Sequence, residues 1–157
     1  MERKKGLLAA GCLLAVGAAA AAWFGLADED HTLSEADAAV FSSASPAPAA
    51  LTLSLDAAPD GAEFCLQNGT GMQLDTGSVN RLEKRAGDGW EAVCGSTEDY
   101  PPGSQTLSAG ETLYGMTGWP EAGITLSAGE YRYQMVVCLY GEEGRMPVIV
   151  EDTFTIR

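Results

Sequence analysis

Histidine and basic residues are scarce in this 157-residue chain. Its only histidine is His31, and no lysine or arginine occurs between Lys5 and Arg81. Histidine is the most frequent general acid or base in catalysis and a common metal ligand. A single histidine therefore excludes the usual catalytic triads and most histidine-based metal sites.

The shortage of basic residues leaves a strongly acidic chain. Its 9 basic and 22 acidic residues give a net charge of −13. Without Glu2 and the three basic residues at positions 3–5, the counts are 6 and 21, and the net charge is −15. Such a surface repels nucleic acid and anionic lipid. We expect no nucleic-acid partner and attribute the acidity to solubility outside the cytoplasm.

Motifs of known catalytic chemistry are also absent. The chain has no glycine-rich phosphate loop, no Gly-x-Ser-x-Gly turn and no EF-hand spacing. Its paired acids, Glu98-Asp99, Glu142-Glu143 and Glu151-Asp152, are explained by solvated turns. We expect no enzyme, no cofactor and no metal site.

The first 27 residues combine a basic start with a long uncharged segment. Arg3, Lys4 and Lys5 precede an Ala-rich apolar run from Gly6 to Ala27. The run is long enough to span a membrane, while Gly25-Leu26-Ala27 also fits a signal-peptidase site. Residues 1–27 are therefore predicted to be a cleaved signal peptide or a single transmembrane anchor. The positive-inside rule places the rest of the chain outside the cytoplasm.

The leader, residues 1–27, has a third possible processing route, which involves Cys12. Leu8-Ala9-Ala10-Gly11-Cys12 is similar to a bacterial lipobox, in which the cysteine is lipidated after cleavage. Few apolar residues precede Cys12, whereas signal peptides have an apolar region of about 7–15 residues. An incidental cysteine within a helix is the alternative.

Residues 28–50 have a different composition. Alanine, serine, proline and acidic residues dominate, and large apolar residues are nearly absent. Such a segment buries too little apolar surface to fold alone. We expect a flexible acidic linker.

Residues 51–157 show the alternation of β-strands separated by turns. Leu51, Leu53 and Leu55 alternate with polar residues. The same pattern places every second residue from Tyr131 to Leu139 on one face, with Arg132 and Gln134 opposite. About seven strands and no amphipathic helix predict an all-β antiparallel sandwich.

A short repeat refines this prediction. Leu107-Ser108-Ala109-Gly110-Glu111 recurs as Leu126-Ser127-Ala128-Gly129-Glu130, and each copy is expected to be a glycine turn that starts a strand. The second copy continues to Tyr131. Its Leu-x-x-Gly-x-Tyr pattern resembles the tyrosine corner of immunoglobulin-like domains, which gives Gly129 and Tyr131 structural roles.

The order of features from Arg81 to Tyr133 extends the resemblance. Arg81–Arg85, a Gly-Asp-Gly turn, Trp90, a long proline-containing loop and the two repeats follow one another. This order resembles the bacterial immunoglobulin-like domains of exported and membrane-anchored envelope proteins. The resemblance implies a β-sandwich and an envelope setting, but no single activity.

The cysteines of the folded region allow several states. Immunoglobulin precedent pairs Cys65 with Cys138, but strand alternation points both outward. Pairing of Cys94 with Cys138 and three unpaired thiols are the alternatives.

Three aromatic residues lie in or next to predicted turns and loops. Trp90 follows a hairpin turn and is expected to pack against the sheet. Tyr100 and Trp119 lie next to prolines in loops, where exposed rings can bind sugars or proteins. If both are exposed, they form the candidate ligand-binding patch.

Together, these features predict a non-enzymatic binding module of the bacterial cell envelope. Its N-terminal segment contacts the membrane, or is removed so that the domain is secreted. The alternatives are an accessory domain that docks on a membrane protein and a carbohydrate-binding module. The expected partner is thus an envelope protein or a polysaccharide.

Overall fold

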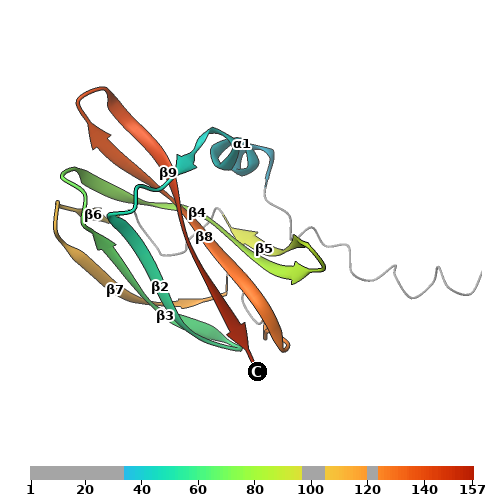
Figure 1. The fold of residues 1–157 in the computed structure, drawn as a ribbon. Helices are drawn as coiled ribbons and strands as arrows, with labels where there is room; N and C mark the ends of the chain where they lie inside the picture. Colours follow the sequence, from blue (N-terminus) through green and yellow to red (C-terminus); the bar gives the residue numbers. More distant parts are fainter. Residues whose placement is uncertain (1–33, 97–104, 120–123) are drawn as a thin grey trace, which may run out of the picture. The chain divides into compact units, whose positions relative to one another are not determined.

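The computed structural model describes residues 34–96, 105–119 and 124–157 (Figure 1). The elements are α1 (Glu35–Ser43), β1 (Ser45–Pro46), β2 (Leu51–Ala58), β3 (Gly61–Asn68), β4 (Gln73–Ala86), β5 (Gly89–Ser96), β6 (Thr106–Leu107), β7 (Thr112–Gly118), β8 (Gly129–Gly141) and β9 (Gly144–Ile156). The predicted leader and Cys12 lie outside these residues. Within the described ranges, no helix is long and apolar enough to cross a membrane.

The strands form two sheets of unequal size. Sheet A has the order β1-β9-β8-β4-β5, with the short strand β6 also paired to β4. Sheet B has the order β2-β3-β7. All pairings are antiparallel except that of β1 with β9. The prediction of an all-β architecture with two sheets is confirmed.

The core lies between the inner faces of the two sheets. Alternate residues of β3, namely Ala62, Phe64 and Leu66, are buried, while Glu63 and Gln67 are exposed. In β8, every second residue from Tyr131 to Leu139 is at most 2% exposed, as predicted, but Gln134 and Val136 on the opposite face are also buried, at 5% and 3%. Burying one face of each strand in this way fixes the register of the sheets.

The segment before β2 departs from the predicted flexible linker. Residues Glu35–Ser43 form α1, whose first turn is capped by Ser34 through a bond from the Asp37 amide to Oγ. Phe41 is buried, and its ring lies 4.6 Å from the guanidinium carbon of Arg81. β1 then adds to the edge of β9. The low apolar content of this segment does not indicate that it is structured, because only one aromatic side chain and one strand pairing hold it in place.

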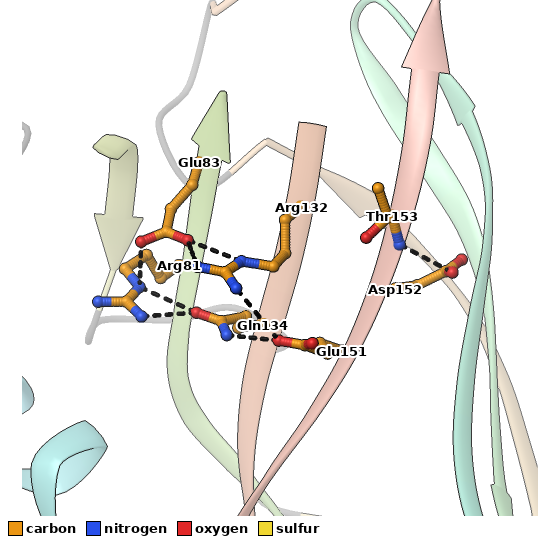
Figure 2. A network of polar contacts seen from close by, with 7 residues as sticks. All are labelled: Arg81, Glu83, Arg132, Gln134, Glu151, Asp152 and Thr153. Atoms are coloured by element: carbon orange, nitrogen blue, oxygen red, sulfur yellow. Dashed lines mark hydrogen bonds and ion pairs between the residues drawn. The ribbon is translucent and has the colours of Figure 1, made fainter. Parts of the chain in front are cut away.

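Asp152 connects the two sheets at one edge of the sandwich. Its Oδ2 accepts a hydrogen bond of 2.8 Å from the Leu55 amide in β2, although 97 residues separate the two. Its Oδ1 accepts another from the Thr153 amide (Figure 2). A carboxylate that accepts backbone amides forms comparatively strong hydrogen bonds. Asp152 therefore satisfies an edge amide of sheet B from the last strand of sheet A.

Tyr131 ties the start of β8 to the turn before it. The ring is 2% exposed, and its hydroxyl donates a 2.8 Å hydrogen bond to the Ser127 carbonyl oxygen. A Cβ at Gly129 would lie 2.6 Å from Cε of Lys84, so the chain passes closely here. This is the contact that the Leu-x-x-Gly-x-Tyr pattern implies.

Replacing Tyr131 with phenylalanine should lower the free energy of unfolding by about 1 kcal/mol, because the buried hydrogen bond to Ser127 is lost. Urea denaturation of the full chain measures this change. Tyr114→Phe is the matched control, since Tyr114 is 75% exposed. Equal losses in both variants would contradict a stabilising role of the corner.

Candidate functional site

The outer face of sheet A carries a network of charged and polar side chains (Figure 2). Glu83 on β4 pairs with Arg81 on the same strand and with Arg132 on β8. Arg81 also donates to Oε1 of Gln134, whose amide nitrogen donates to Glu151 at 2.6 Å. The side chain of Glu83 is only 9% exposed, so its two arginine partners compensate for its loss of solvent.

Aromatic rings complete this network on two sides. The guanidinium carbons of Arg132 and Arg85 lie 4.8 and 5.2 Å from the ring centroid of Trp90. The ring of Phe41 covers Arg81. Cation–π contacts of this kind stabilise partly desolvated arginines. Because its charges are engaged internally, we interpret the network as structural. Trp90 thus packs on the sheet by contacting the guanidinium groups of Arg85 and Arg132.

The outer face of sheet B has the opposite character. Tyr114 and Met116 are the exposed large hydrophobic side chains of the described residues, at 75% and 77%. They lie two residues apart on β7 and therefore share one face. Their register partners on β3 are Cys65 and Glu63, respectively. The sheet therefore presents apolar side chains next to a carboxylate, in contrast to the compensated charges of sheet A.

A second cluster joins β4, β6 and β8. The Asp75 carboxylate accepts hydrogen bonds from the hydroxyls of Thr106, at 2.6 Å, and Tyr140, at 2.5 Å. The Thr106 bond is the larger cause of a lowered pKa of Asp75, and the Tyr140 bond comes second. The same bond to Asp75 raises the pKa of Tyr140. The cluster thus fixes the two-residue strand β6 through an ionised carboxylate.

The predicted ligand-binding patch does not form as expected. Trp119 is 4% exposed, stacks on Phe154 with centroids 5.3 Å apart, and donates from Nε1 to the Pro59 carbonyl oxygen. Its ring is part of the core, so it offers no surface to a ligand. Tyr100 lies outside the described residues.

The cysteines also have assigned places. Cys65 and Cys138 are both free and half-buried. They belong to different sheets and lie on the outward faces that strand alternation predicts, so the Cys65–Cys138 bridge is not formed. Only the backbone of Cys94 is described; it is in register with Leu82.

The described residues do not form a cluster of potential metal ligands. Among residues 34–96, 105–119 and 124–157, no group of three or more His, Cys, Asp and Glu side chains is placed to hold a metal ion. The acidic side chains described above belong to the Glu83 network and the Asp75 cluster. Both consist of bonds within the protein.

Sequence reasoning missed the exposed surface of sheet B. Alternation places Tyr114 and Met116 on one face, but it does not say which face of β7 is covered. The two-residue spacing of Arg81 with Glu83, and of Arg132 with Gln134, was a usable signal for the network of sheet A.

Comparison with known proteins adds no relative. No protein-family model, curated protein or solved structure matches the chain.

Replacing Glu83 with alanine should lower the free energy of unfolding by about 2 kcal/mol, between the values for exposed and buried ion pairs. The loss follows because Arg81 and Arg132 keep their partial burial without their carboxylate. Chemical denaturation tests this, with the exposed Glu91→Ala on β5 as the control. A change of less than about 0.5 kcal/mol, as expected for a surface residue, would contradict the role of Glu83.

The Asp75 cluster should respond to acid in a defined direction. The pKa of Asp75 is lowered in the folded protein. The ionised carboxylate therefore stabilises the fold at any pH above the ordinary pKa of an aspartate. That contribution is lost as the pH falls through the lowered pKa. We expect Thr106→Val to raise the pKa of Asp75 more than Tyr140→Phe does. NMR titration of the Asp75 carboxyl carbon measures both, with the exposed Thr155→Val as the control. An unchanged pKa in Thr106→Val would contradict this account.

Proposed function

We propose that the protein is a non-enzymatic, extracytoplasmic interaction module of the bacterial cell envelope, built on an immunoglobulin-like sandwich. The basic and apolar leader supports export. The domain is then either anchored in the membrane or secreted. The proposed mode of action is recognition by the outer face of sheet B. The observation that carries it is the joint exposure of Tyr114 and Met116.

Strand order supports the immunoglobulin-like assignment. The order β2-β3-β7 corresponds to strands A, B and E of immunoglobulin domains, and β9-β8-β4-β5 corresponds to G, F, C and C′. The hydroxyl of Tyr131, bonded to Ser127 at the start of the strand equivalent to F, adds the tyrosine corner. These agreements concern the fold, and fold alone does not specify an activity.

Exposure of the two side chains favours contact with a protein. The other large apolar side chains with assigned exposure in the described ranges are buried or half-buried. Neighbouring apolar groups on a sheet face are typical of interaction surfaces. The accessory role, in which the domain docks on a membrane protein, uses the same surface. The carbohydrate-binding alternative loses support, because the ring of Trp119 is buried.

Site-specific crosslinking in cells tests the proposal. The full chain is expressed with the photoreactive residue p-benzoylphenylalanine in place of Tyr114 or, as the control, in place of the exposed Thr155 on β9. We expect a discrete protein adduct from position 114 and none from position 155. An absence of any adduct from position 114 would contradict recognition through this face. Retention on envelope polysaccharide that survives Tyr114→Ala would instead support the carbohydrate alternative.

A further inference from the structure

Two carboxylates face each other on the outer side of sheet B. Asp56 on β2 is in direct register with Glu63 on β3, and both are exposed. Like charges directly opposite on neighbouring strands destabilise a sheet. Glu63 is in turn the register partner of Met116 on β7. One row across the sheet thus holds two negative charges and an exposed apolar side chain.

The strands that carry this row contribute no positive charge to it. Strands β2, β3 and β7 include no lysine or arginine. All basic residues after position 5 belong to strands of sheet A or follow β9. The neighbouring row, of Ala58, Gly61 and Gly118, carries almost no side-chain volume. A hollow of about 430 Å³ lies there, bordered by Asp56, Asp60, Glu63 and Met116.

We propose that the Asp56–Glu63–Met116 row docks a segment of a partner protein that carries a lysine or arginine beside an apolar residue. This inference rests on the proposed function and specifies the chemistry of its partner. The cationic head of the incoming side chain lies between the two carboxylates and relieves their repulsion. Its apolar stem covers Met116, as long basic side chains cover apolar surface elsewhere.

Other occupants fit the row less well. A divalent cation needs several converging oxygen ligands, and the described residues contain no group of three or more potential ligands placed for one. A second copy of this chain would bring two domains of high negative charge together. Its Arg81 and Arg132 are moreover bonded to Glu83. Charge complementarity therefore favours a basic partner segment.

Fluorescence anisotropy with a labelled Lys-Leu-Lys-Leu-Lys peptide tests the proposal on the full chain. We expect Asp56→Asn combined with Glu63→Gln to weaken binding at least tenfold. Glu142→Gln combined with Glu143→Gln removes the same charge from the β8–β9 turn and should change affinity less than twofold. Met116→Ser should weaken binding several-fold with all charges kept. Equal losses in the two double variants would reveal attraction by net charge alone and overturn the proposal.

Three further readouts separate the remaining outcomes. The Asp56→Asn/Glu63→Gln variant should retain its cooperative unfolding, because both side chains are exposed. Displacement of the peptide by micromolar calcium chloride, or self-association of the chain that blocks the peptide, would identify a different occupant and overturn the proposal. In the crosslinking assay, an adduct from position 114 that persists unchanged in the double variant would overturn this inference and leave the proposed function standing.

Discussion

The register of β8 is the constraint on which the rest of the domain depends. β8 pairs with β4 on one side and β9 on the other, so its inner side chains run through the middle of sheet A. Tyr131, at one end of this row, is locked by its bond to Ser127. A shift by one residue would exchange the core row for Arg132 and Gln134. The register of β8 therefore determines at once which residues form the core and which form the polar network.

The two outer faces carry their charges in different ways. On sheet A, Arg81 and Arg132 meet Glu83 at positions where burial would otherwise make each charge costly. On sheet B, Asp56 and Glu63 are exposed, so water screens their repulsion and the sheet tolerates it. Charges that are half-buried thus have internal partners, whereas the opposed carboxylates remain on the solvent side.

Local pattern was sufficient to predict the strands and the two-sheet architecture, because burial in a sheet has a period of two. It was insufficient where a single distant contact decides the outcome. Phe41 orders the segment before β2 by packing on Arg81, 40 positions away. Trp119 joins the core through Phe154 and the carbonyl of Pro59. No local signal distinguishes such residues from the exposed aromatics that their proline-rich surroundings suggest.

The Asp56–Glu63–Met116 row depends on the register between neighbouring strands. The alternation within β2 and β3 does not by itself predict that register. The hairpin between them places Asp56 opposite Glu63; a register shift of one residue would separate the charges. If acidity served solubility alone, dispersed carboxylates would achieve it without opposing like charges. A cation bound in the row would relieve the direct opposition of the two carboxylates beside Met116, on a sheet whose strands carry no basic residue. This relief of repulsion is the physical basis of the proposed recognition surface.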